Sequence, residues 1–414
     1  MLRGSCIIAQ SGGPSAVINS SICGAIETAL KSDVITKVYG ALNGIQGVLD
    51  DMLCDMSNES PEEIHLLKTT PSSALGSCRL KLPDASIDDS KYKRILEVFK
   101  KYDIRYFFYN GGNDSMDTCM KVSAYMEKVG YECRILGIPK TIDNDLALTD
   151  HCPGFASAAK YIATSIMEVR RDISVYTKGS LIIFEIMGRN AGWLAASSAL
   201  ASVTGEGPDL IYLPETTFDL DKFFEKAASI YAEKGNCIVA LAEGVKDKDG
   251  VYISEYGSNL AKTLDVFGHA QMGGLANYLV MEAKNRIEGV KVRGIELSLL
   301  QRCASHCASE TDIEEAYMAG KAAVEGALSG QTNKMVAFER NYINGKYVCS
   351  TKFVNLEKVA NLEKTVPLEW ILPDGEGMTQ EFIDYALPLI QGQTKLPYEN
   401  GLPRFAKLSK TVVR

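Results

Sequence analysis

Short apolar segments alternate with amphipathic segments through most of this chain, and no other feature restricts the fold as strongly. The apolar segments with the length of buried strands are residues 5–10, 105–109, 133–138, 181–186, 209–213, 237–241 and 292–297. After the first of them, apolar side chains recur at spacings of three and four, which place them on one helical face: Ile18, Ile22, Ala25, Ile26, Ala29 and Leu30. The sequence therefore predicts an α/β fold with parallel sheets.

A chain of 414 residues is long for one domain. We expect two lobes, each with a mostly parallel sheet flanked by helices, and a ligand site in the cleft between them. We assign residues 1–150 to an N-terminal α/β lobe and residues 151–340 to a second lobe, with the chain crossing back to the first. Residues 341–414 are predicted to form a C-terminal hairpin and helical extension.

Two local signals support this view of the C-terminal part. Asn344-Gly345 lies between two apolar pairs and predicts a tight β-hairpin. Thr311 and Glu314 have the spacing of a capping box, and we expect the helix that they begin to stop at Gly330.

Composition excludes several classes of protein. No apolar run approaches the roughly 18 residues that a membrane span needs, and the N-terminus lacks the pattern of a signal peptide. Eleven cysteines without a repeated spacing fit reduced thiols in a cytosol, so we expect a cytoplasmic protein. A net charge of −8 argues against nucleic acid or an anionic membrane as the main partner.

Two glycine-rich turns follow expected strands and precede expected helices. Gly12-Gly13 follows residues 5–10, and Gly111-Gly112-Asn113-Asp114-Ser115 follows residues 105–109. Backbone N–H groups in such turns, with the helix N-terminus, can bind an anion. A tight turn without a ligand is the alternative for each turn taken alone.

Charged residues end two further strands. Residues 139–145 read Pro-Lys-Thr-Ile-Asp-Asn-Asp, with Lys140, Asp143 and Asp145 at the edge where open α/β sheets bind ligands. Met187-Gly188-Arg189 follows another strand, and arginine there suits bidentate phosphate recognition. A surface turn with an ion pair and an arginine at a helix C-terminus are the alternatives.

In this order, the segments resemble the phosphofructokinase family over roughly residues 5 to 340. The motifs that carry the resemblance are Gly12-Gly13, Gly111 to Ser115, Thr141 to Asp145, Met187 to Arg189, Glu243-Gly244 and Gln301-Arg302. The resemblance implies transfer of a phosphoryl group to the 1-hydroxyl of fructose 6-phosphate. The first lobe would then hold the phosphoryl donor and the second the sugar phosphate.

The family's roles carry over by position. Asp143 corresponds to the general base that takes the proton of the sugar hydroxyl, a task that suits a carboxylate ionised at neutral pH. Thr141 would hold the sugar or the transferring group. The other substrate-binding positions are Met187, Gly188, Arg189, Glu243 and Arg302, and the donor positions are Gly12, Gly13 and Arg79. Arg293 matches an arginine that reaches in from a neighbouring subunit, which implies a homodimer or homotetramer.

Two positions depart from the pattern of the ATP-dependent members. Asp114 and Lys140 stand where those members carry glycine, and both match the pyrophosphate-dependent branch. At about 4 Å and an effective dielectric constant near 20, like charges repel by about 4 kcal/mol, roughly a thousandfold in binding, so Asp114 would exclude the ATP α-phosphate. Lys140 would meet charge on the leaving phosphate. The expected reaction is reversible and uses pyrophosphate.

The resemblance also implies Mg²⁺. Asp145 is a candidate ligand, whereas Asn113 stands where the family carries a magnesium-binding aspartate and is the weaker candidate. Residues 268–274 superficially match a family motif but carry Met272 where arginine is needed, so Arg293 and Arg302 are the better match. We assign the earlier segment to an insertion that begins a helix through Leu279.

Three rival functions have to be weighed. Asp114 and Lys140 argue against an ATP-dependent phosphofructokinase. The intact Asp143 and Arg302 argue against a non-catalytic subunit that binds sugar phosphate. A Rossmann dehydrogenase is disfavoured because this chain lacks the glycine motif that such an enzyme carries after its first strand. A metal site formed by Cys303, His306 and Cys307 on one helix is less well supported than simple packing.

Overall fold

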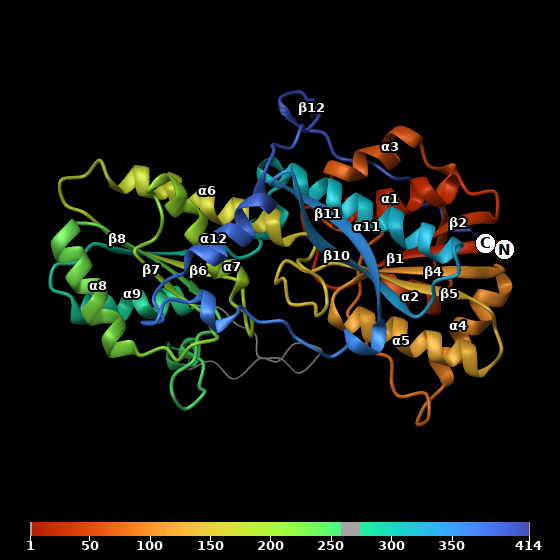
Figure 1. Cartoon of the computed structure of the whole chain (residues 1–414), viewed down its shortest axis with the longest axis horizontal. Helices are drawn as coiled ribbons and strands as arrows, with labels where there is room; N and C mark the ends of the chain where they lie inside the picture. Colours follow the sequence, from red (N-terminus) through yellow and green to blue (C-terminus); the bar gives the residue numbers. More distant parts are fainter. Residues whose placement is uncertain (1, 258–273, 414) are drawn as a thin grey trace.

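A seven-stranded sheet forms the first lobe (Figure 1). The computed structural model describes residues 2–257 and 274–413. The strand order is β11-β10-β5-β4-β1-β2-β3, and β3 and β11 are the antiparallel edges. The strands are β1 (Gly4–Gln10), β2 (Ile35–Ala41), β3 (Leu53–Asp55), β4 (Ile104–Gly111), β5 (Arg134–Pro139), β10 (Lys334–Ile343) and β11 (Lys346–Asn355).

Helices cover both faces of this sheet because its strands bury alternate side chains on opposite sides. Cys6 and Ile8 of β1 join the core under α1 and α11, whereas Ile7 and Ala9 join the core under α4 and α5. The helices of this lobe are α1 (Ile18–Leu30), α2 (Gly44–Leu49), α3 (Pro61–Leu66), α4 (Ser90–Lys101), α5 (Asn113–Lys128) and α11 (Glu310–Leu328). Five residues of the expected stripe on α1 are buried, and Leu30 is exposed.

The second lobe has a four-stranded parallel sheet in the order β7-β8-β6-β9. Its strands are β6 (Leu181–Ile186), β7 (Leu210–Tyr212), β8 (Cys237–Ala242) and β9 (Val292–Glu296). Its helices are α6 (Phe155–Ile173), α7 (Trp193–Ala196), α8 (Leu220–Lys234), α9 (Leu275–Arg286), α10 (Leu300–Cys303) and α12 (Gln380–Ala386). The predicted α/β fold with two sheet-bearing lobes is confirmed, and the expected strands are present with ends that differ by at most two residues.

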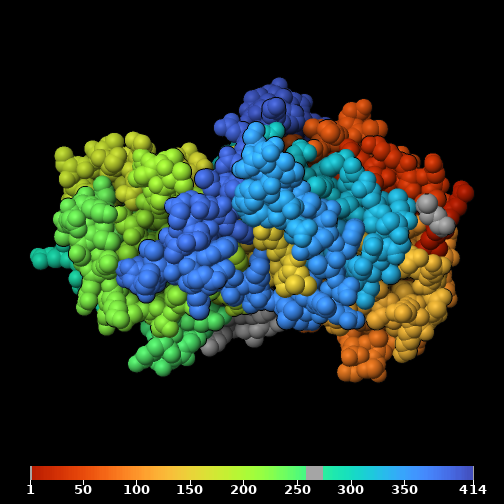
Figure 2. Space-filling model, viewed as in Figure 1, coloured from red at the N-terminus to blue at the C-terminus, as the bar shows by residue number. Residues whose placement is uncertain are grey.

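The chain passes repeatedly between the lobes. It enters the second lobe through α6 and returns with α11, which packs on α1. After β11 it crosses again, so that α12 joins the core of the second lobe, and then returns to form the ion pair of Arg404 with Glu63. Figure 2 shows the blue C-terminal residues lying across both lobes. β10, which runs through residue 340, and β11, which follows it, therefore complete the first sheet. The three residue ranges themselves stay a prediction.

Some local expectations need correction. The helix α11 begins at Glu310, and the Ser309 hydroxyl accepts from the Asp312 N–H at 3.4 Å. The capping box of Thr311 and Glu314 is therefore wrong, because the cap lies two residues earlier. The hairpin is confirmed: Ile343 pairs with Lys346, and Asn344 and Gly345 both have positive φ.

The segment 268–274 lies almost wholly outside the described residues. Gly274 is its described part and caps α9, which includes Leu279. Elsewhere, no helix that the structure describes has the length and apolar character of a membrane span.

A buried ionic network around His151 fixes β10 and α11 to the segment that links the lobes. The fully buried His151 ring contacts Asp150 through Nδ1 at 2.8 Å and Glu315 through Nε2 at 2.7 Å. Arg340 donates twice to Asp150, both at 3.0 Å. Burial lowers the pKa of His151, but hydrogen bonds to both carboxylates outweigh burial and leave its pKa above the usual value.

We predict that His151→Ala lowers the free energy of unfolding by about 3–5 kcal/mol, because it leaves two largely buried carboxylates without their shared partner. The measurement is urea denaturation followed by circular dichroism. Lys93→Ala is the control, since it breaks an exposed pair with Asp89 worth at most about 0.5 kcal/mol. Equal losses in the two variants would contradict a stabilising role for the network.

Candidate active site

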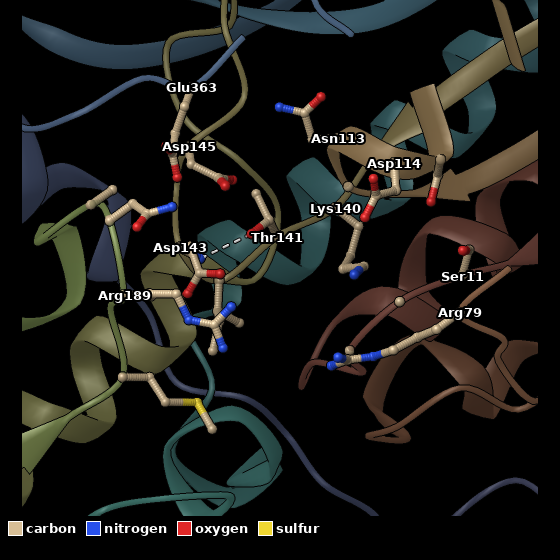
Figure 3. A pocket seen from close by; sticks show the side chains of 18 of the residues that line it. Ser11, Arg79, Asn113, Asp114, Lys140, Thr141, Asp143, Asp145, Arg189 and Glu363 are labelled. Atoms are coloured by element: carbon tan, nitrogen blue, oxygen red, sulfur yellow. Dashed lines mark hydrogen bonds between the residues drawn. The ribbon is translucent and has the colours of Figure 1, made fainter. Parts of the chain in front are cut away.

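A cavity of about 660 Å³ lies between the lobes and is lined by loops from both (Figure 3). It opens at the carboxyl ends of β1, β4, β5, β6 and β8, where parallel strands present their loops together. It brings together most positions expected to carry function: Gly12, Gly13, Arg79, Asn113, Asp114, Lys140, Thr141, Asp143, Asp145, Met187, Gly188, Arg189, Glu243 and Arg302. Arg293 is the expected site residue that does not line it.

Positive charge gathers over the Gly12-Gly13 turn. A Cβ atom on Gly12 would lie 3.0 Å from Lys140 Nζ, and one on Gly13 would lie 2.9 Å from Arg302 Nη1. Burial lowers the pKa of Lys140 to about 8; Asp143 and Asp145 oppose this shift, while Arg302 and Arg79 add to it. Lys140 therefore remains mostly charged at neutral pH, and this wall of the cavity suits a compact polyanion.

The turn after β4 supplies the neighbouring part of this wall. α5 begins at Asn113 directly after Gly112, so its N-terminus lies at the cavity. Asp114 in the first turn is exposed at the rim. Asp114 lies in α5 after β4, whereas Lys140 directly follows β5, so the two side chains line the cavity from different segments.

Negative charge occupies the opposite side of the cavity, where Figure 3 shows Asp143, Asp145 and Glu363. Thr141 Oγ1 accepts from the Asp143 N–H at 3.1 Å and so orders the loop. Burial, followed by the charges of Asp145 and Glu243, raises the pKa of Asp143 to about 7. A carboxylate poised near neutral pH can act as a general base.

The second lobe contributes the turn after β6. Gly188 has a φ of 144°, and its N–H donates to Glu243 Oε1 at 3.5 Å. The Met187 N–H donates to Gln301 Oε1 at 3.3 Å. These bonds fix the turn so that Met187 and Arg189 line the cavity. Burial raises the pKa of Glu243, which therefore ionises less readily than an exposed glutamate.

Arg293 lies elsewhere. It extends from β9 into a separate cavity of about 230 Å³, which Ser180 also lines. A single chain thus leaves Arg293 outside the main cavity.

Cys303, His306 and Cys307 do not share a helix, because α10 ends at Cys303 and a separate 3-10 turn holds residues 305–307. In residues 2–257 and 274–413, the group that could hold a metal by proximity is His151, Glu315 and Cys349. Both ring nitrogens of His151 already contact carboxylates. This arrangement is a structural network.

Sequence reasoning missed several residues that line the cavity, among them Lys81, Asn190, Asn361 and Glu363. Asn190 directly follows the Met187-Gly188-Arg189 motif, so its position next to that motif could have predicted that it lines the cavity. Asn361 and Glu363 lie more than two hundred residues from the loops that they face, and no local pattern marks them.

Comparison with known proteins identifies the family of this chain. The sequence pattern of the family described as Phosphofructokinase matches residues 5–310. A pyrophosphate–fructose 6-phosphate 1-phosphotransferase of Halomonas elongata is 45% identical, covering 99% of this chain and 97% of that protein. Another of the same name from Methylococcus capsulatus is 45% identical over 98% and 96%.

A solved structure shows the same fold. The crystal structure of a pyrophosphate-dependent phosphofructokinase from Marinobacter aquaeolei is 41% identical, with a TM-score of 0.88, and covers 99% of this chain and 97% of that chain. The resemblance inferred from the motifs is confirmed over the whole length of the chain. The chain belongs to the phosphofructokinase family.

Proposed function

We propose that this chain is a pyrophosphate-dependent phosphotransferase that reversibly transfers a phosphoryl group from pyrophosphate to the 1-hydroxyl of fructose 6-phosphate. The observation that carries the proposal is the pair Asp114 and Lys140 in one cavity, with Lys140 Nζ held over Gly12. Relatives with 45% identity bear the name of this activity.

The donor binds on the cationic side of the cavity. Gly12 and Gly13 admit the phosphate groups close to the backbone, and Arg79 and Lys140 offset their charge. Lys140 meets the negative charge that develops on the leaving phosphate, which is the stabilisation that phosphoryl transfer chiefly requires. Asp114 at the rim repels a nucleotide that would continue beyond the second phosphate.

The sugar phosphate binds on the side of the second lobe. Arg189 and Arg302 offset its phosphate, and Met187, Gly188 and Glu243 define the sugar pocket. Asp143 takes the proton of the 1-hydroxyl as the oxygen attacks phosphorus. Thr141 holds the transferring group beside it.

A divalent cation, for which we propose Mg²⁺, fits the acidic side of the cavity. Asp145 Oδ1 is a buried oxygen that finds no hydrogen-bond partner among residues 2–257 and 274–413, as expected of a group kept for a cation. When bound, the cation neutralises charge on the pyrophosphate. Asn113 fits less well, because its amide already bonds the backbone of residues 361 and 362.

The donor preference is the first test. We expect the wild type to use pyrophosphate and not ATP, Asp114→Gly to make ATP measurably usable, and Lys140→Gly to slow the pyrophosphate reaction. The measurement is kcat/KM for both donors in a coupled assay with fructose 6-phosphate, with the double mutant testing for coupling. A wild type that prefers ATP, or one without any transferase activity, would overturn the proposal.

The role of Asp143 is the second test. Asp143→Ala should lower kcat by about a hundred- to ten-thousandfold with little change in sugar-phosphate binding. Because burial raises the pKa of Asp143 to about 7, kcat/KM of the wild type should fall as the pH drops below 7 and the base becomes protonated. Asp249→Ala, an exposed aspartate outside the cavity, is the control. A variant with near-normal turnover would remove Asp143 from this role.

Assembly is the third test. Arg293 lies outside the cavity of its own chain, and we propose that it completes the site of a neighbouring subunit in a homodimer or homotetramer. Sedimentation at assay concentration should detect at least a dimer. Mixing inactive Arg293→Ala with inactive Asp143→Ala should restore part of the activity, because a mixed dimer contains one site with both residues. A fully active monomer would contradict this.

A further inference from the structure

The side chain of Asn113 joins the start of α5 to a segment far along the chain. Asn113 Nδ2 donates to the Leu362 carbonyl at 2.6 Å, and its Oδ1 accepts from the Asn361 N–H at 2.5 Å. Asn361 has a φ of 62°, which turns its backbone toward α5, and its own amide donates to Asp117 at 3.3 Å. Both ends of the Asn113 amide are thus engaged with backbone.

The same segment also contacts the loop that holds Asp143. The Lys364 N–H donates to the Asp145 carbonyl at 2.7 Å, and Glu363 pairs with Leu146 in an isolated antiparallel bridge. Lys364 Nζ then donates to the carbonyls of Thr149 at 3.1 Å and Asp150 at 2.9 Å. Residues 361–364, here called the strap, therefore connect the turn after β4 to the loop after β5.

The strap is part of the wall of the cavity. Asn361 and Glu363 line it, and Figure 3 shows Glu363 beside Asp145 on the acidic side. Because Asn113 and Asp145 bind the strap at its two ends, the position of Glu363 depends on both attachments. Loss of the Asn113 hydrogen bonds would release the end of the strap that lies nearest the turn after β4.

We propose that Asn113 is a positioning residue, which uses the strap to hold the donor turn and the loop of the base in register and to place Glu363 in the cavity wall. The inference rests on the proposed function for its activity readouts. The inference also explains why residue 113 is asparagine and not aspartate. A carboxylate only accepts hydrogen bonds, so aspartate would keep the bond from Asn361 but would face the Leu362 carbonyl with a like partial charge.

The test compares Asn113→Ala and Asn113→Asp with the wild type. Hydrogen exchange of the backbone amides of Asn361 and Lys364, followed in metal-free enzyme, should accelerate about ten- to hundredfold in Asn113→Ala, since both hydrogen bonds to the strap are lost. Asn113→Asp keeps the bond from the Asn361 N–H and loses the bond to Leu362, so its acceleration should be smaller. Asn341→Ala and Asn341→Asp are the matched controls, because Asn341 also donates to a backbone carbonyl but lies in the exposed hairpin. They should leave exchange in the strap unchanged.

Activity supplies the second readout. Both Asn113 variants should lower kcat/KM with pyrophosphate by at least about tenfold. In combination with Glu363→Gln, the effects of Asn113→Ala should be non-additive, because both changes act through the position of one side chain. Additive effects would overturn the proposal, and so would unchanged exchange.

One result would favour a different role. If Asn113→Asp lowered the concentration of Mg²⁺ needed for activity and left exchange unchanged, residue 113 would act at the metal and the proposal would fall. Failure of the proposed function is distinguishable, because a wild type that does not use pyrophosphate leaves the exchange experiment valid.

Discussion

The buried charge of Lys140 determines how the rest of the cavity is arranged. Lys140 is 5% exposed, and burial of an ammonium group is costly unless other groups offset its charge. The carboxylates of Asp143 and Asp145 favour its charged form, whereas the charges of Arg302 and Arg79 oppose it. Lys140 therefore lies where carboxylates and guanidinium groups meet, an arrangement that suits the movement of a phosphoryl group between two anionic molecules.

The C-terminal residues hold this arrangement together. β11 completes the first sheet, the strap contacts both loops of the cavity, and α12 packs into the second lobe. Tyr385 of α12 accepts from Asn144 at 2.9 Å, directly beside the base. Residues beyond the part matched by the family pattern therefore help to order the residues within it.

Much of the fold was predictable, because the spacing of apolar residues within a short stretch of sequence distinguishes strands from helices. The central strands and the hairpin followed from runs such as 181–186 and from Asn344-Gly345. β2 was not predicted, since Thr36 and Lys37 interrupt its apolar positions. The start of α11 was misplaced because Ser309 and Thr311 are both good caps, and only packing decides between them.

For the site as well, residues marked by local sequence patterns could be predicted, and those placed by long-range contacts could not. Motifs at strand ends could be found, because the fold itself brings carboxyl ends of parallel strands together. Glu363 and Asn361 could not, since their place depends on a long-range crossing and on hydrogen bonds to backbone. The role of Arg293 depends on a second subunit, so neither one sequence nor one chain tests it.

The repeated passage of the chain between the lobes has a mechanical consequence. A body attached by one pair of adjacent segments can swing about them like a door. Here the segments leading to α6, α11 and α12 and the return to Glu63 join the two lobes by several crossings, which restrain their relative rotation more than one pair of segments would. Any closure of the lobes around a substrate must therefore bend several chain segments at once.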